Sequence, residues 1–210
     1  AQAPTLEDIQ RRAASAQPGA FGSLRFPVDS PSAFPQWRSV WRETQGQSAR
    51  LAACLRNSDS AEGCGRRPWR RWASVVRRAR AADGLDRLKL VNAFFNSWPY
   101  REDLANYGRR EAWVAPMTFF AQSGDCEDYA IAKYATLRLA GFSDDRMRIV
   151  VIRDRIRAIR HAVLVVEWNG ERHVLDSLSD GIFADAMYTH YEAQYSLNAS
   201  GQWTHGSSGR

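Results

Sequence analysis

An Asn-Gly pair between two apolar segments constrains the fold of this 210-residue chain more than any other feature. Residues 161–168 and 171–178 have the composition of strands, and Asn169-Gly170 between them favours a two-residue type I′ turn. In that register Trp168 pairs with Glu171. A further strand is expected over residues 148–153. The sequence therefore predicts an antiparallel sheet in which one turn specifies the pairing of two strands.

The same register places one histidine beside a carboxylate. Val163 would face Asp176, so His161 and Asp176 become diagonal neighbours on one face, about 7–8 Å apart at Cα, within side-chain reach. His173 would face Val166 on the other face. A histidine oriented by a carboxylate is the base-and-orienter half of a nucleophilic triad. A structural histidine is the alternative, and a slip of one residue would separate the pair.

Several amphipathic helices are expected before the hairpin. Residues 67–81 and 85–98 each present one apolar face, and Pro99 ends the second helix. Residues 36–56 carry a broken helical pattern that Gly46 could interrupt. Residues 100–122 are expected to be irregular. A short helix is expected over residues 6–14, then extended chain, while the last thirty residues carry no clear pattern.

Arginine dominates the charge of the chain. The formal net charge is +6, and the helix expected over residues 67–81 is crowded with arginines opposite its apolar face. This face could bind an acidic partner or a membrane surface, but a solvated face is the more common role of such a charge run. Its tryptophans lie on the core side, so we expect no nucleic-acid partner. No stretch of 18 apolar residues suggests a transmembrane helix.

One cysteine lies where a nucleophile would be activated. Ser123-Gly124-Asp125 precedes a helix that begins at Cys126 and ends before Gly141. The positive end of the helix dipole stabilises a thiolate, and its free amides can bind an oxyanion. Position alone leaves nucleophile and structural cysteine equally open. The order cysteine on a helix, then histidine and aspartate on strands, favours the nucleophile.

Three carboxylates flank this cysteine. Asp125, Glu127 and Asp128 would raise the free energy of a neighbouring thiolate unless something neutralises them. Acidic capping of the helix N-terminus is one explanation. A bound calcium ion, which prefers carboxylate oxygens, is the other. Zinc and nucleotide motifs do not occur in the sequence.

The other two cysteines indicate an oxidising compartment. Cys54 and Cys64 lie ten residues apart in a polar stretch, so a local disulfide is expected, with two unpaired cysteines as the alternative. The start at Ala1 without an apolar leader is typical of a mature chain after signal removal, or of a trimmed one. We therefore expect export. His190 and His205 are expected at the surface.

The segment around Cys126 resembles a known family. Residues 123–134 read SGDCEDYAIAKY and are similar to the bacterial transglutaminase-like cysteine proteinases, the family of the LapG-type periplasmic proteases. The likeness extends from about residue 85 to 180. It also includes the segments VNAFFN (91–96), WVAP (113–116), RHAVL (160–164) and VLD (174–176).

The resemblance implies a papain/transglutaminase-like α+β fold, with a helical N-terminal part packed on a small antiparallel sheet. Residues 1–84 would be a helical extension of the same unit, and residues 85–210 the peptidase core. By position, Cys126 would be the nucleophile, His161 the general base and Asp176 the orienting acid. A calcium cofactor held by Asp125, Glu127 and Asp128 is also implied.

The family further implies a periplasmic enzyme whose protein substrate is a large surface adhesin, cut near its N-terminus to release cells from a biofilm. An inner-membrane receptor for cyclic-di-GMP would sequester it. Two other functions stay open from sequence. The same triad could act on side-chain amides, as a transglutaminase or deamidase, or the chain could be a catalytically inert binding module.

Overall fold

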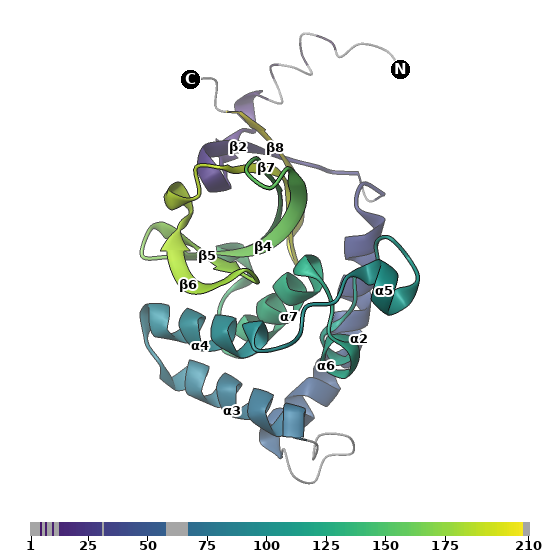
Figure 1. Cartoon of the computed structure of the whole chain (residues 1–210). Coiled ribbons are helices and arrows are strands. Elements are labelled where there is room, and N and C mark those ends of the chain that lie inside the picture. Colours follow the sequence, from purple (N-terminus) through teal and green to yellow (C-terminus); the bar gives the residue numbers. More distant parts are fainter. Residues whose placement is uncertain are drawn as a thin grey trace.

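The computed structural model describes residues 13–30, 32–57 and 67–207, and also residues 5, 7 and 10. In this part of the chain a curled sheet has eight strands in the order β1-β2-β8-β7-β3-β4-β5-β6, and all neighbouring strands are antiparallel (Figure 1). The strands are β1 (Gln17–Pro18), β2 (Ser23–Pro27), β3 (Met147–Asp154), β4 (Ile159–Trp168), β5 (Glu171–Asp176), β6 (Ser179–Ala184), β7 (Tyr191–Asn198) and β8 (Gly201–Ser207).

The predicted hairpin has the expected register. Trp168 pairs with Glu171, and Val166 pairs with His173. Asn169 and Gly170 both have positive φ, 51° and 79°, as a type I′ turn requires. The predicted strand at 148–153 is β3, at the centre of the sheet.

Helices cover one face of the sheet. They are α2 (Pro35–Arg56), α3 (Arg67–Ala81), α4 (Gly84–Asn96), α5 (Asp103–Tyr107), α6 (Pro116–Gln122) and α7 (Cys126–Leu139). Helix α7 packs directly against β3 and β4, α4 packs against α7, and α3 packs on α4 farther from the sheet (Figure 1). None of the helices within the described residues is both long and apolar enough to cross a bilayer.

One large core joins the helices to the sheet. Trp37 and Trp72 from the first helices share it with Phe95, Tyr134 and Leu164. The indole Nε1 of Trp72 donates a hydrogen bond of 3.0 Å to Oγ1 of Thr136 on α7. A smaller apolar cluster, which includes Val150, Val165 and Val174, lies on the other face of the curled sheet.

Three local expectations were wrong. Gly46 does not interrupt α2, which runs unbroken over 22 residues because packing of its buried face outweighs the low helix propensity of one exposed glycine. Residues 100–122 are not irregular throughout, because α5 and α6 form within them. His205, expected at the surface, lies half-buried on β8, where both of its ring nitrogens contact serine hydroxyls. The last thirty residues, for which the sequence gave no prediction, contribute β7, β8 and most of β6.

Two expectations fall partly outside the described residues. Cys54 is disulfide-bonded and Cys126 is free, but Cys64 lies outside the described part of the chain. Of the helix expected over 6–14, residues 6, 8, 9, 11 and 12 also lie outside it.

Candidate active site

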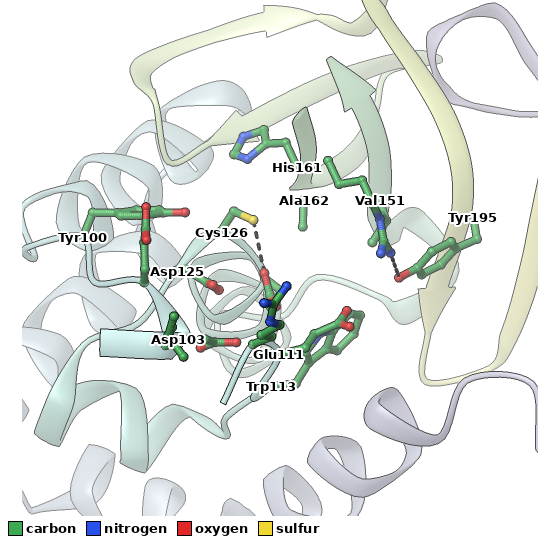
Figure 2. Close-up of a pocket in the computed structure, with 15 residues that line it drawn as sticks. Tyr100, Asp103, Glu111, Trp113, Asp125, Cys126, Val151, His161, Ala162 and Tyr195 are labelled. Carbon is green, nitrogen blue, oxygen red and sulfur yellow. Dashed lines mark hydrogen bonds between the residues drawn. The ribbon is translucent and has the colours of Figure 1, made fainter. Parts of the chain in front are cut away.

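A cleft of about 610 Å³ opens where the N-terminus of α7 meets β3 and β4. Cys126 and His161 both line it, and the segment before α6 forms the opposite wall with Tyr100, Asp103 and Trp113 (Figure 2). The Nε1 donor of Trp113 is buried without a hydrogen-bond partner among the described residues. The cleft therefore brings a thiol and an imidazole together, with the Trp113 ring in its wall.

Cys126 is the first residue of α7. Its Sγ donates a hydrogen bond to Oε2 of Glu127 at 3.1 Å. Burial raises the pKa of the Cys126 thiol well above its usual value, and the charges of Glu127 and Asp125 raise it further, while a hydrogen bond from the Ala162 backbone lowers it. The thiol is therefore the favoured form of Cys126 as long as the carboxylates beside it are not neutralised.

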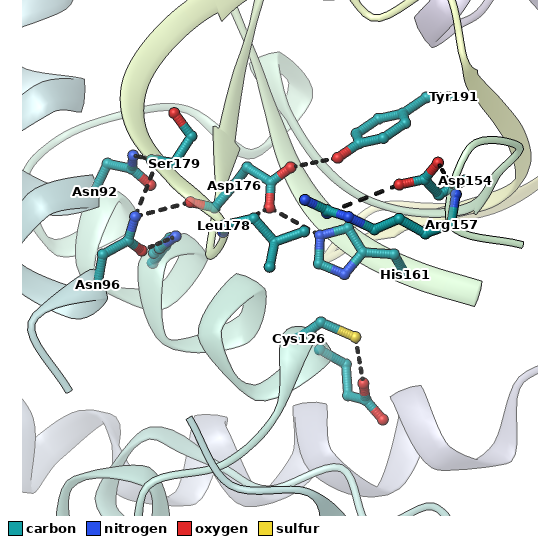
Figure 3. A network of polar contacts seen from close by, with 12 residues as sticks. Asn92, Asn96, Cys126, Asp154, Arg157, His161, Asp176, Leu178, Ser179 and Tyr191 are labelled. Carbon is teal, nitrogen blue, oxygen red and sulfur yellow. Dashed lines mark hydrogen bonds and ion pairs between the residues drawn. The ribbon is translucent and has the colours of Figure 1, made fainter. Parts of the chain in front are cut away.

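His161 and Asp176 form the predicted pair. Nε2 of His161 lies 2.8 Å from Oδ1 of Asp176, and both side chains are buried. Figure 3 shows the imidazole between Asp176 and Cys126, so its second nitrogen faces the thiol side. His173 faces away on the other side of the hairpin, as the register requires.

Asp176 is held as a carboxylate by three donors. Burial raises its pKa, but hydrogen bonds from His161, from the Leu178 backbone (2.9 Å) and from the Tyr191 hydroxyl (2.7 Å) outweigh that effect and lower the pKa below its usual value. Tyr191 comes from β7, on the other side of β3 and β4 from β5. A charged Asp176 is therefore available to orient the His161 ring.

A half-buried amide and a buried lysine support the backbone of Asp176. Nδ2 of Asn96 donates to the carbonyl oxygens of Asp176 (2.9 Å) and Ser179 (3.0 Å) (Figure 3). Nζ of Lys133, on α7, donates to Oδ1 of Asn96 at 2.8 Å. This chain of hydrogen bonds links the helix that carries Cys126 to the strand end that carries Asp176.

The turn before Cys126 is strained. Ser123 has a φ of 66°, in the left-handed region that non-glycine residues rarely adopt. Its Oγ donates to the Pro99 carbonyl, its N–H donates to the Phe119 carbonyl at 2.7 Å, and its own carbonyl accepts from the Tyr107 hydroxyl at 3.1 Å. These contacts hold the strained turn that aims α7 at the cleft.

A cluster of three carboxylates lies beside this turn. Asp103, Asp125 and Asp128 offer oxygen atoms that lie within 4.8 Å of one another (Figure 2 shows Asp103 and Asp125). Oδ1 of Asp103 and Oδ1 of Asp125 are buried without a hydrogen-bond partner among the described residues. Burial and mutual repulsion raise the pKa of Asp125 to about 8 and that of Asp128 to about 9. Such a cluster has the donor set, and the unsatisfied oxygens, that fit a calcium ion.

The structure divides the acidic residues predicted as metal ligands into two groups. Asp125 and Asp128 lie with Asp103, whereas Glu127 lies with Asp125 and the Cys126 thiol. Asp128 also accepts hydrogen bonds from the backbone N–H groups of Val114 (2.7 Å) and Asp125 (3.3 Å). It therefore caps the helix as well, so the capping and metal explanations do not exclude each other.

Sequence reasoning missed four residues of this region: Asp103, Tyr191, Asn96 and Lys133. Asp103 lies in the long segment before Cys126, whose length indicated a functional role without singling out a residue. Lys133 could have been found, because the sequence places it among the apolar residues of the helix that begins at Cys126. Lysine is rarely buried unless it is paired, so a lysine at such a position needs a polar partner. Asn96 was visible only as the last residue of the family-like segment VNAFFN (91–96), and Tyr191 gave no signal.

The fold and this site define a class. A cysteine at a helix N-terminus, facing a histidine and an aspartate on a curled antiparallel sheet, is the arrangement of the transglutaminase-like cysteine hydrolases. The model of one family, described as bacterial transglutaminase-like cysteine proteinase, matches residues 58–209. The chain belongs to that family and is a cysteine proteinase.

Solved structures agree with this assignment. Legionella pneumophila LapG matches with a TM-score of 0.64 and 29% sequence identity, over 73% of this chain and 87% of that one. Its calcium-bound structure gives the same values. An EGTA-treated structure has a TM-score of 0.64 and 28% identity, over 75% and 90%. No curated protein matches the sequence. The predicted family and α+β fold are therefore confirmed.

Proposed function

We propose that this chain is a calcium-dependent cysteine endopeptidase in which Cys126 is the nucleophile, His161 the general base and Asp176 the orienting acid. The observation that carries the proposal is the 2.8 Å contact from Nε2 of His161 to Oδ1 of Asp176, with the ring facing Cys126 across the cleft (Figure 3). One occupied ring nitrogen leaves the other to accept the thiol proton.

The reaction would proceed through an acyl-enzyme. His161 takes the proton of the Cys126 thiol, and the thiolate attacks a backbone carbonyl of the substrate. The backbone N–H of Cys126, which contacts the Tyr100 hydroxyl in this structure, stabilises the oxyanion. The imidazolium then protonates the leaving amine, and water hydrolyses the thioester. Asp176 holds the tautomer of His161 throughout.

Calcium would be held by Asp103, Asp125 and Asp128, with Glu127 as a further candidate ligand. A bound divalent cation supplies positive charge that neutralises the carboxylates next to the nucleophile. Two observations support this: the unpartnered oxygens of Asp103 and Asp125, and the calcium-bound structure of the Legionella pneumophila relative. Calorimetry with calcium tests the ligand set directly. Asp103→Asn should weaken binding, while Asp86→Asn, at an exposed position of α4, should not.

The substrate and compartment follow from the family likeness. We propose a periplasmic enzyme that cuts a large surface adhesin and so releases cells from a biofilm, and that an inner-membrane cyclic-di-GMP receptor sequesters. The disulfide-bonded Cys54 supports an oxidising compartment. Purified adhesin fragments would be incubated with the wild-type enzyme and with Cys126→Ala. New N-termini by mass spectrometry support cleavage, whereas ammonia release without new termini supports deamidation.

Thiol alkylation tests the triad without a known substrate. The folded protein is treated with iodoacetamide over a range of pH, with calcium or with a chelator, and the labelled residue is mapped by mass spectrometry. His161→Asn should slow labelling of Cys126 by about 100-fold or more at neutral pH, because the thiolate loses its partner.

His173→Asn is the matched control, since His173 is equally buried on the neighbouring strand but faces away. Equal labelling rates in wild type and His161→Asn would refute the triad. Labelling rates that are the same with calcium and with the chelator would refute the calcium dependence but not the triad.

A further inference from the structure

A second cavity lies on the face of the sheet opposite α7, beside the small apolar cluster of Val150 and Val165. Its volume is about 30 Å³, which is room for about two water molecules. Four arginines line it: Arg25 from β2, Arg146 from the turn before β3, Arg148 from β3 and Arg172 from β5. Residues far apart in the sequence thus bring like charges to one small space.

The positive charge of this cavity is only partly balanced. Glu167 is the acidic residue among those that line it, and Arg172 is already paired with Asp185 at 2.7 Å. Within the described part of the chain, neither Arg25 nor Arg148 makes an ion pair, and Nε of Arg25 donates only to the neutral Oε1 of Gln17 at 3.1 Å. Nε of Arg148 is buried and has no hydrogen-bond partner there. A buried donor without an acceptor is unfavourable, and an anion would satisfy it.

One indole ring holds the two unpaired guanidinium groups in place. Cζ of Arg148 lies 5.0 Å, and Cζ of Arg25 5.4 Å, from the centroid of the Trp203 ring. Both distances are typical of cation–π contacts, which orient an arginine fork without neutralising it. Burial and the charge of Arg25 lower the pKa of Arg148 to about 10, and the opposing charges of Glu167 and Asp145 do not offset this effect.

The remaining wall is neutral and tightly packed. Nδ1 of His205 lies 2.7 Å from Oγ of Ser23, whose own proton goes to the Ala20 carbonyl, so Nδ1 carries the hydrogen. Nε2 then accepts from Ser196 at 2.8 Å. A Cβ on Gly19 would lie 2.9 Å from the imidazole, so a glycine is required there. Burial and the charges of Arg25 and Arg148 lower the pKa of His205 to about 4, so His205 is uncharged near neutral pH and the positive charge of the cavity comes from its arginines.

We propose that this cavity binds a phosphate group, held by Arg25 and Arg148 with Arg146 at the rim. The small volume excludes a nucleotide base, and its room for about two water molecules admits two oxygens of a tetrahedral anion, whose other oxygens would lie at the rim. Arginine forks match phosphate oxygens in pairs, and a dianion would offset both unpaired guanidinium groups where a carboxylate would offset one. The site lies across the sheet from the catalytic cleft and is independent of the proposed protease chemistry.

Calorimetry and thermal unfolding with inorganic phosphate test this site in the full chain. Titrations are run without calcium and at constant ionic strength, with chloride as the reference anion. Phosphate should bind and raise the melting temperature, and chloride should not. Because a charge-assisted contact is lost, Arg148→Gln should weaken phosphate binding about tenfold or more.

Three further variants keep the test decisive. Arg148→Lys retains the charge but lacks the fork, and should also weaken binding while preserving the fold. Arg153→Gln removes one charge from an exposed position on the same strand and should change affinity less than about twofold. Arg25→Gln should weaken binding like Arg148→Gln, so the result holds even where one variant fails to fold.

A second titration with glycerol phosphate identifies the source of the group. Equal affinity for glycerol phosphate indicates a phosphomonoester of a larger molecule as the ligand, and binding of inorganic phosphate alone indicates the free ion. Either result supports the site. The absence of binding by both would overturn it, as would an equal loss of affinity in Arg153→Gln and Arg148→Gln.

Discussion

Gly124→Ala should unfold the turn that positions the nucleophile. A Cβ on Gly124 would lie 2.1 Å from Oδ2 and 2.6 Å from Cβ of Asp128, so rotation of the Asp128 side chain alone cannot make room. Asp128 is fully buried, and its carboxylate accepts from Val114 N at 2.7 Å and Asp125 N at 3.3 Å. With calcium chelated, the raised pKa of about 9 leaves the Asp128 carboxyl uncharged near neutral pH, so losing both bonds costs about 1–3 kcal/mol. That is a large share of the about 5–15 kcal/mol that stabilises a typical domain.

Gly46→Ala is the matched control, because the same chemical change occurs where there is room. Gly46 lies on the exposed side of α2, and a Cβ there would meet no atom within 4 Å. Replacing glycine in a helix interior should stabilise the protein by about 0.5–1 kcal/mol.

Urea unfolding of both variants, followed by far-ultraviolet circular dichroism in the presence of a chelator, measures the two effects. We expect free energies of unfolding that change in opposite directions. A Gly124→Ala protein within about 1 kcal/mol of wild type would show that the close approach of Asp128 does not constrain this turn.

Three other predictions concern buried polar groups. Burial lowers the pKa of His205 from 6.5 to about 4, so the unfolded chain binds a proton more readily than the folded one between these pH values. The free energy of unfolding should therefore fall by up to about 3 kcal/mol from pH 6.5 to 4, and His205→Asn should reduce this fall when urea unfolding is measured at each pH. Burial lowers the pKa of Lys133 to about 7, so the wild type should gain stability as the pH rises above 7, and Lys133→Met should lose that gain in the same assay. Trp72→Phe should cost about 1–3 kcal/mol by leaving Thr136 unpaired, and a double-mutant cycle with Thr136→Val should show non-additivity.

The parts of this site that could be predicted from the sequence depend on local geometry. The Asn169-Gly170 turn specifies the register of β4 and β5, and that register alone places His161 beside Asp176. Likewise, the position of Cys126 follows from the residues that begin α7. Each of these inferences needs only a short segment and the regular spacing of side chains along one strand or one helix.

The residues that hold Asp176 in place come from other elements of the fold, and their positions depend on tertiary packing. A single sequence does not show which elements pack against each other. Tyr191 reaches Asp176 because β7 lies on the far side of β3, a neighbourhood set by the order of strands in the sheet. Asn96 reaches the Asp176 carbonyl because α4 packs against α7 and the end of β5. No periodicity in residues 91–96 or 191–198 indicates either contact.

Asp103 shows why the acidic cluster was only half predicted. The carboxylates adjacent to Cys126 were visible because they are neighbours in sequence, and their closeness suggested one shared ligand set. Neighbouring positions on a helix point in different directions, however, so Glu127 faces the thiol while Asp125 and Asp128 face the loop. A third oxygen donor must then come from whatever segment packs against that side, and here it is the short helix α5. Sequence spacing therefore identifies candidate ligands, but the packing of the loop decides which of them share one ion.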